Sequence, residues 1–220
     1  MTKAEVRALI EEIGIVPAVR VAGRELACFA ANAVYHGGIP VAEITMTVPD
    51  ALGVIAELRT SHPDMVVGAG TVLDAATAKK CLDAGALFLT SPGFLPEVVE
   101  VAIRHGVAVF PGALSPSEVI AAWNAGSDFV KIFPCDPVGS YHYIRTLKAP
   151  LPQILLIASG GVTQHTASDF IAAGASALGI GTELIPAEAL QKRKETQIHE
   201  LARRFLGMVK EARAKANHVI

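Results

Sequence analysis

Residues 106–133 read GVAVFPGALSPSEVIAAWNAGSDFVKIF, two short apolar runs separated by a helical pattern. Ser115 followed by Pro116 marks the start of the helix, because serine caps a helix and proline suits its first position. Gly126 marks its end, where glycine adopts the left-handed conformation at low cost. The stretch therefore predicts a strand, a helix and a second strand. Both strands are nearly all apolar, which is typical of parallel strands covered on both faces.

The same alternation recurs along the whole chain. Apolar runs predict eight strands, at Ile15–Val21, Val41–Met46, Met65–Gly70, Leu87–Ser91, Val107–Phe110, Phe129–Phe133, Ile154–Ala158 and Ala177–Ile180. Glycines follow the helical patterns between them, at Gly37, Gly85, Gly106, Gly126 and Gly174. Eight strands alternating with eight helices predict an α/β fold, a (β/α)8 TIM barrel, with an extra amphipathic helix at the N-terminus.

No linker interrupts this alternation, so we expect a single domain over residues 1–220. A doubly wound open sheet is the structural alternative, but no GxGxxG motif follows the first strand. The last helix is predicted at about residues 197–214. One of its faces carries Leu201, Phe205, Met208 and Ala212, which indicates packing against the barrel or a partner.

The composition excludes several classes of protein. A net charge of −2 gives no basic surface for nucleic acid. No run reaches the ~18 apolar residues that cross a bilayer, and acidic residues interrupt the N-terminus, so neither a membrane span nor a signal peptide is expected. Three scattered cysteines suit a reduced, cytoplasmic protein. The 51% hydrophobic content must be covered by a fully buried sheet or by a subunit interface.

In barrel enzymes the reacting side chains lie where the strands end. Lys131 stands among apolar residues in FVKIF, where a low dielectric favours a neutral, nucleophilic amine. The alternative is a lysine whose amine reaches solvent. The period of two in VAEITMT places Glu43 on the same side as Thr45 and Thr47. Strands two and six share an interior layer, so Glu43 and Lys131 can meet as base and nucleophile, or as a structural ion pair.

Small residues follow the last two predicted strands. Gly160 and Gly161 follow strand seven, and Gly181 and Thr182 follow strand eight, where this fold usually holds phosphate. A glycine pair alone is usually just a turn, so the prediction depends on both loops together. Arg20 ends strand one, either as a positive charge for an anionic substrate or as an ordinary surface residue.

Two further loops are expected at the same end of the barrel, where the strands finish. Thr71 follows strand three in GAGTV, where its hydroxyl can donate to a carboxylate. Pro92 follows strand four in TSPG, as a substrate contact or a simple turn. Four histidines lack the spacing of metal ligands, so we expect no metal site: His36, His62, His105 and His165.

Together these motifs resemble a known family, the 2-keto-3-deoxy-6-phosphogluconate (KDPG) and 4-hydroxy-2-oxoglutarate (KHG) aldolases. The similar blocks occur in family order and extend to about Ala189: VAEIT at 41–45, GAGTV at 68–72, SPG at 91–93, FPG at 110–112, KIFP at 131–134 and SGGV at 159–162. One branch of the family has an arginine where Thr47 stands. Arg20 is typical of the other branch, which includes the galactonate-derived (KDPGal) aldolases.

The resemblance implies a class I aldolase that needs no metal or other cofactor and serves Entner–Doudoroff metabolism as a homotrimer. Lys131 would form the Schiff base, and Glu43 would be the general acid/base. The residues implied to bind the substrate are Thr71, Pro92 and Phe133 around pyruvate, and Gly160, Gly161 and Thr182 around phosphate, with Arg20 as a positive charge.

The expected reaction is cleavage of a 2-keto-3-deoxy-6-phospho-sugar acid to pyruvate and glyceraldehyde 3-phosphate. One alternative is an aldolase for 4-hydroxy-2-oxoglutarate, which gives pyruvate and glyoxylate. Others are a phosphate-binding barrel isomerase or epimerase, which forms no Schiff base, and a barrel that only binds sugar phosphates. Thr182 stands where the family usually has serine. The need for a substrate phosphate and the stereochemistry at C4 therefore stay open.

Overall fold

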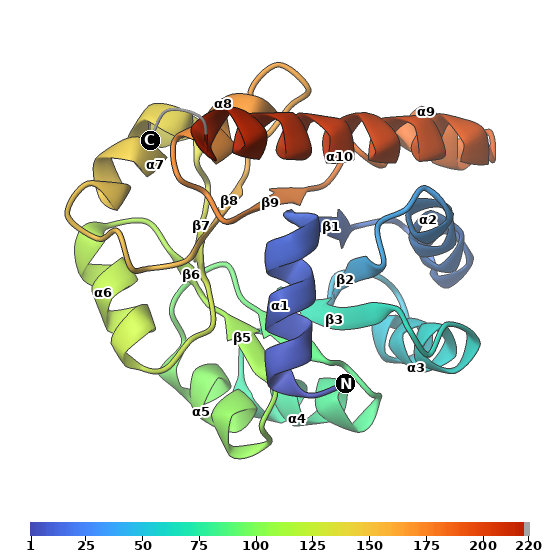
Figure 1. The fold of residues 1–220 in the computed structure, drawn as a ribbon. Coiled ribbons are helices and arrows are strands. Elements are labelled where there is room, and N and C mark those ends of the chain that lie inside the picture. Colours follow the sequence, from blue (N-terminus) through green and yellow to red (C-terminus); the bar gives the residue numbers. More distant parts are fainter. Residues whose placement is uncertain (218–220) are drawn as a thin grey trace.

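The computed structural model describes residues 1–217, in which nine parallel strands form one sheet that curves into a barrel (Figure 1). The strands are β1 (Ile15–Val19), β2 (Val41–Thr45), β3 (Val66–Gly70), β4 (Phe88–Thr90), β5 (Ala108–Phe110), β6 (Gly112–Ala113), β7 (Val130–Ile132), β8 (Leu156–Ser159) and β9 (Ala177–Ile180). Their order is β5-β4-β3-β2-β1-β9-β8-β7-β6.

β5 and β6 are two halves of one barrel strand, interrupted at Pro111. β5 pairs with β4, and β6 pairs with β7. Proline has no N–H to donate, but the carbonyl oxygen of Pro111 accepts a hydrogen bond from the N–H of Lys131 at 2.9 Å. The carbonyl oxygen of Val109 accepts another from the N–H of Asp128 at 3.1 Å. Backbone pairing therefore continues past the proline and closes a barrel of eight strand positions.

Helices alternate with the strands and cover the outside of the barrel (Figure 1). After α1 (Lys3–Ile13), they are α2 (Arg24–His36), α3 (Ala51–Ser61), α4 (Ala75–Asp83), α5 (Pro96–Arg104), α6 (Pro116–Asn124), η1 (Asp136–Val138), α7 (Tyr141–Lys148), α8 (Ala167–Ala172), α9 (Ala187–Gln191) and α10 (Glu195–Asn217). The predicted (β/α)8 barrel with an extra N-terminal helix is confirmed.

Several details differ from the sequence expectation. The fifth strand extends past Phe110 as β6, and the last helix is longer than predicted, starting at Glu195. Gly37 was expected to be left-handed, but its φ is −73°, and Gly38 instead has a φ of 100°. The chain makes its left-handed turn one residue later because Gly37 is still helical. The expected domain runs to residue 220, and residues 218–220 lie outside the described part.

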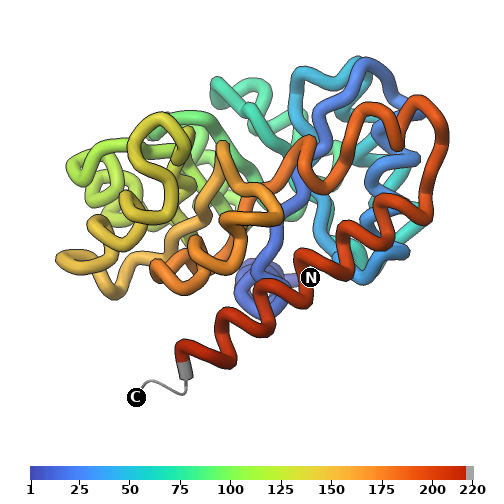
Figure 2. The backbone as a smooth tube through the Cα atoms, turned by 90° about the horizontal axis from the view of Figure 1, so that it is seen from above, coloured from blue at the N-terminus to red at the C-terminus, as the bar shows by residue number. Residues whose placement is uncertain are grey.

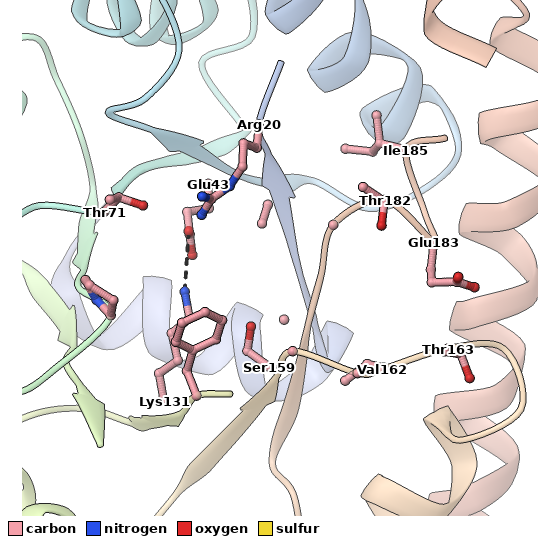
Figure 3. A pocket seen from close by; sticks show the side chains of 17 residues that line it. Arg20, Glu43, Thr71, Lys131, Ser159, Val162, Thr163, Thr182, Glu183 and Ile185 are labelled. Atoms are coloured by element: carbon pink, nitrogen blue, oxygen red, sulfur yellow. Dashed lines mark ion pairs between the residues drawn. The ribbon is translucent and has the colours of Figure 1, made fainter. Parts of the chain in front are cut away.

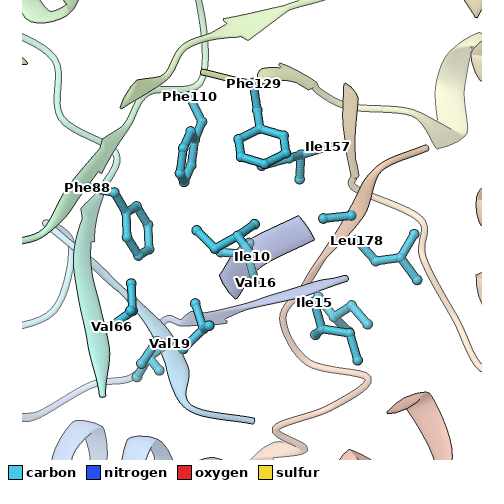
Figure 4. Close-up of a cluster of buried hydrophobic side chains, with 14 of the residues drawn as sticks. Ile10, Ile15, Val16, Val19, Val66, Phe88, Phe110, Phe129, Ile157 and Leu178 are labelled. Carbon is cyan, nitrogen blue, oxygen red and sulfur yellow. The ribbon is translucent and has the colours of Figure 1, made fainter. Parts of the chain in front are cut away.

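α1 lies across the end of the barrel at which the strands begin, and it plugs the core there. Its Ile10 is fully buried and points among the barrel side chains (Figure 4). Three phenylalanines pack inside the barrel as well. The rings of Phe88 and Phe110 stack at 5.0 Å, and those of Phe110 and Phe129 meet edge to face at 5.1 Å. This packed interior leaves the opposite end of the barrel as the open one.

α10 is the long helix that runs along the outside of the barrel, against α2 and α8 (Figure 2). It buries Ile198, Ala202 and Phe205 completely. Arg213, near its end, donates hydrogen bonds to the carbonyl oxygens of Glu11 in α1 and Ser176 just before β9, which ties α10 to both elements. None of the helices within residues 1–217 is both long and apolar enough to cross a membrane.

Candidate active site

A pocket with a volume of about 440 Å³ opens at the carboxyl ends of the strands (Figure 3). Its lining includes all nine residues that the sequence analysis named as site residues: Arg20, Glu43, Thr71, Pro92, Lys131, Phe133, Gly160, Gly161 and Thr182. The rest of the lining is Ala18, Ser159, Val162, Thr163, Gly179, Gly181, Glu183 and Ile185. The pocket therefore collects side chains from loops spread over the whole chain.

Lys131 and Glu43 meet across the mouth of the barrel. β2 and β7 occupy opposite positions of the closed sheet, and each points one of these side chains inward. Nζ of Lys131 lies 3.6 Å from Oε1 of Glu43, an ion pair whose side chains are only 13% and 4% exposed. The predicted meeting of these residues is confirmed. The separation exceeds that of a normal hydrogen bond, so the two groups interact as an ion pair.

Phe133 shields the amine of Lys131. The ammonium nitrogen lies 5.7 Å from the centre of the Phe133 ring, within the range of a cation–π contact. Both side chains lie at the end of β7, where the chain turns away at Pro134. The ring gives the amine an apolar wall on one side and leaves the carboxylate of Glu43 on another.

Thr71 has a strained backbone. Its φ of 58° lies in the left-handed region, which costs a β-branched residue about 1–3 kcal/mol. Hydrogen bonds hold the chain on either side, because Gly70 accepts from the N–H of Met46 at 2.8 Å and the N–H of Val72 donates to Thr90 at 3.0 Å. The side chain of Thr71 points towards the Lys131–Glu43 pair (Figure 3). The strained backbone thus places the side chain of Thr71 in the lining of the pocket.

Gly160 and Gly161 form the turn after β8. Their φ values of 80° and 95° are both left-handed. A Cβ on Gly161 would lie 2.5 Å from Cβ of Asp136, so the site also has no room for a side chain. The N–H groups of Cys135 and Asp136 donate to the carbonyl oxygen of Gly160 at 3.1 and 3.0 Å. These hydrogen bonds from residues 135 and 136 therefore hold the loop in place, and its backbone faces the pocket.

Glu183 is a pocket residue that the sequence analysis missed. It directly follows Thr182, and Figure 3 shows it between Thr182 and Thr163. A carboxylate repels a phosphate group, so Glu183 is unexpected at the end of the pocket where phosphate was predicted. No sequence signal singled it out, because an exposed acidic residue after a strand is common. Its place in the pocket lining depends on how the loops after β8 and β9 fold together.

Cys135 lies next to this pocket but does not compete with Lys131 as a nucleophile. Burial raises the pKa of its thiol to about 11. The Sγ–H group donates to the carbonyl oxygen of Ile132 at 3.2 Å. Since the thiolate is the reactive form, a thiol that stays protonated at neutral pH is inert.

Comparison with known proteins identifies the family. The model of the KDPG and KHG aldolase family matches residues 6–201. The chain belongs to this family. It is a class I aldolase, that is, a carbon–carbon lyase, as the resemblance implied.

Three relatives of this aldolase are informative. A 2-dehydro-3-deoxy-phosphogluconate aldolase of Treponema pallidum is 30% identical over 91% of this chain and 95% of its own. The crystal structure of a KDPG aldolase from Legionella pneumophila, with pyruvate captured as a covalent carbinolamine, superposes with a TM-score of 0.83 at 26% identity, covering 90% of this chain and 96% of that one. The KDPG aldolase of Zymomonas mobilis ZM4, solved with 3-phosphoglycerate, has a TM-score of 0.84 at 25% identity, covering 94% and 97%.

Proposed function

We propose that this aldolase cleaves 2-keto-3-deoxy-6-phospho-sugar acids to pyruvate and glyceraldehyde 3-phosphate, with Lys131 as the Schiff-base lysine and Glu43 as the general acid/base. The observation that carries the proposal is the ion pair of these two residues, nearly buried inside an open pocket. An amine nucleophile needs a group that moves protons within reach of it. The Legionella relative, with its pyruvate carbinolamine, supports the same chemistry.

The reaction begins when the neutral amine of Lys131 attacks the C2 ketone of the substrate. The resulting carbinolamine loses water and becomes an iminium ion. Glu43 then takes the proton of the C4 hydroxyl, the C3–C4 bond breaks, and its electrons enter the iminium to give an enamine. An aldehyde leaves. Glu43 returns a proton to C3 of the enamine, and water hydrolyses the new iminium to release pyruvate and the free lysine.

The remaining pocket residues would orient the substrate in this reaction. The hydroxyl of Thr71 would hold the carboxylate of the pyruvate half, between Pro92 and Phe133. Orientation of this kind accounts for several kcal/mol of a barrier, about 7–11 kcal/mol at most. The residues proposed to hold the far, anionic end of the substrate are Gly160, Gly161 and Thr182, with Arg20 as the positive charge.

A second candidate substrate is 4-hydroxy-2-oxoglutarate, which carries no phosphate and would give pyruvate and glyoxylate. The observation in its favour is Glu183 at the same end of the pocket, whose negative charge repels a phosphate dianion more strongly than the single carboxylate at the far end of this substrate. The Schiff-base chemistry is identical for the two substrates. They differ only in the group that faces the β8 and β9 loops.

Reduction with borohydride in the presence of pyruvate tests the proposed chemistry. The intact protein should gain the mass of one reduced pyruvate adduct, and peptide sequencing should place it on Lys131. Lys131→Ala should abolish the adduct. Lys148→Arg is the matched control, because Lys148 is another partly buried lysine whose pKa is lowered by burial, while its ammonium donates to two carbonyl oxygens. Labelling that survives in Lys131→Ala would reject the assignment.

We further propose that residues 1–220 form one aldolase domain that assembles as a homotrimer and acts in the cytoplasm, in Entner–Doudoroff-type breakdown of sugar acids. Exposed apolar side chains support the assembly, since Leu73, Ile103 and Ile120 are 54%, 44% and 42% exposed in the monomer. Light scattering coupled to size exclusion tests the oligomeric state, and a monomer mass would overturn it.

A further inference from the structure

A cluster of two histidines and a glutamate lies outside the active site. Nδ1 of His36 is 3.0 Å from Oε1 of Glu195, and Nε2 of His199 is 3.2 Å from the same oxygen. The three ligand atoms all lie within 4.8 Å of one another. No metal site was expected from the sequence, because His36 has no second histidine at ligand spacing. His199 is 163 residues further along the chain, and only the fold brings it close.

The geometry of the cluster suits a metal ion. Ligand atoms of a tetrahedral zinc site lie about 3.4 Å from one another, given Zn–N and Zn–O bonds of about 2.0–2.2 Å. The two short separations are close to this value. Glu195 and His199 are four residues apart on α10, so they project from the same helix face. The nitrogens of His36 and His199 lie within 4.8 Å of each other, so a shift of the exposed His36 ring towards His199 would bring them to the spacing of a tetrahedral site.

The two helices are held at the close approach that the cluster needs. His36 is the last residue of α2, and Gly37 follows it. A Cβ on Gly37 would lie 2.7 Å from Cβ of Ala202 and 3.2 Å from Cα of His199. Only glycine therefore lets the end of α2 come this near to α10. Ile198, next to His199, is fully buried and fixes the helix in place.

The neighbouring positive charges are paired with other carboxylates. Lys192 and Lys194 both form ion pairs with Glu188, and Arg193 pairs with Glu25. The carboxylate of Glu195 therefore interacts with the two histidines and not with these cations. Histidines that act as metal ligands are neutral imidazoles. The side chains of His36 and Glu195 are 51% and 42% exposed, so an ion and its water can reach them from solvent.

We propose that His36, Glu195 and His199 form a site for a divalent transition-metal ion, best suited to Zn²⁺, which joins α2 to α10. Imidazole nitrogen and carboxylate oxygen are zinc ligands, and water would fill the fourth position. α2 ends where β2 begins, so the site lies at the end of the barrel opposite to the active-site pocket. The ion would stabilise the packing of the two helices and would leave the Lys131–Glu43 pair untouched.

Titration of EDTA-treated, dialysed protein with ZnCl₂ against a chromophoric chelator tests the proposal. One equivalent should bind, and the thermal unfolding midpoint should rise with zinc, because a ligand that binds only the folded state stabilises it. His36→Gln and His199→Gln should each lower the zinc affinity by about 10-fold or more. Loss of a residue that only supports a metal ligand already costs about 10-fold. The matched control is His105→Gln, which changes a histidine at the C-terminal end of α5. This variant should keep the zinc affinity and the zinc-dependent rise of the unfolding midpoint.

The proposal is overturned if the wild type binds no stoichiometric zinc, or if both histidine variants keep its affinity and its thermal shift. His36 is half exposed, so His36→Gln should remain folded, and its circular dichroism spectrum without zinc checks this. Aldolase turnover should be equal with and without zinc. The outcome is therefore independent of the borohydride experiment on Lys131.

Discussion

Gly70 makes the space in which Glu43 lies. A Cβ atom on Gly70 would be 2.1 Å from Oε1 of Glu43, so a side chain there would force Glu43 to move. β3 lies beside β2, and the side chain of Glu43 leans along its strand, over Gly70, towards the mouth of the barrel. The position of the proposed base is thus set by the absence of a side chain on the neighbouring strand.

Gly70→Ala should therefore displace Glu43 and lower kcat by about 10²-fold, the usual cost of moving a catalytic group by about 1 Å. The lysine is unaffected, so borohydride trapping of pyruvate on Lys131 should persist. Gly93→Ala is the control, because a Cβ there meets nothing within 4 Å, although Gly93 lies on the same rim. Equal turnover of the two variants would show that Gly70 does not position the base.

Glu43→Gln removes the proposed acid/base and keeps the size of the side chain. We expect kcat to fall by about 10²–10⁴-fold, the range that general acid–base catalysis contributes. Pyruvate trapping should remain measurable, because the amine of Lys131 is still present. Steady-state kinetics and intact mass together test this expectation. Glu200→Gln on the outer face of α10 should leave both unchanged, and a fully active Glu43→Gln would remove Glu43 from the mechanism.

Glu183→Gln should change the preference between substrates. Two unit charges at 4 Å interact by about 1 kcal/mol in water, so loss of one carboxylate near a phosphate dianion should raise kcat/KM for the phosphorylated substrate about 10-fold. The value for 4-hydroxy-2-oxoglutarate should rise less, because the group at its far end is a carboxylate with a single charge. A lactate-dehydrogenase-coupled assay measures both. Glu97→Gln, an equal change of charge on α5 outside the pocket lining, is the control. An unchanged substrate ratio in Glu183→Gln would argue against this role.

Phe110→Ala should destabilise the barrel strongly. Phe110 is fully buried and contacts the rings of both Phe88 and Phe129, so truncation should cost about 3–5 kcal/mol in the free energy of unfolding. Urea denaturation followed by circular dichroism measures the loss. Lys79→Ala, at an exposed side chain on α4, should change stability by less than about 0.5 kcal/mol. Similar losses in both variants would mean that the aromatic cluster is not the centre of the core.

The fold was predictable because its signals are local. The apolar residues on either side of Lys131 in β7, and the serine and glutamate that cap α6, are signals that depend only on neighbours in the chain. The break of the fifth strand at Pro111 was not predictable in the same way. Proline is normally read as the end of a strand, and only the N–H of Lys131, across the barrel seam, shows that the pairing continues.

For the candidate site, too, the local features were predictable from the sequence and the contacts between distant residues were not. Alternation along VAEIT and FVKIF was enough to turn Glu43 and Lys131 inward, and a parallel barrel brings the ends of its strands to one face. Their 3.6 Å separation, the space left by Gly70, the placement of Glu183 and the approach of His36 to His199 all depend on how distant segments pack. A linear pattern records which way each side chain faces, whereas contacts between distant residues are set by the packing of whole helices and strands.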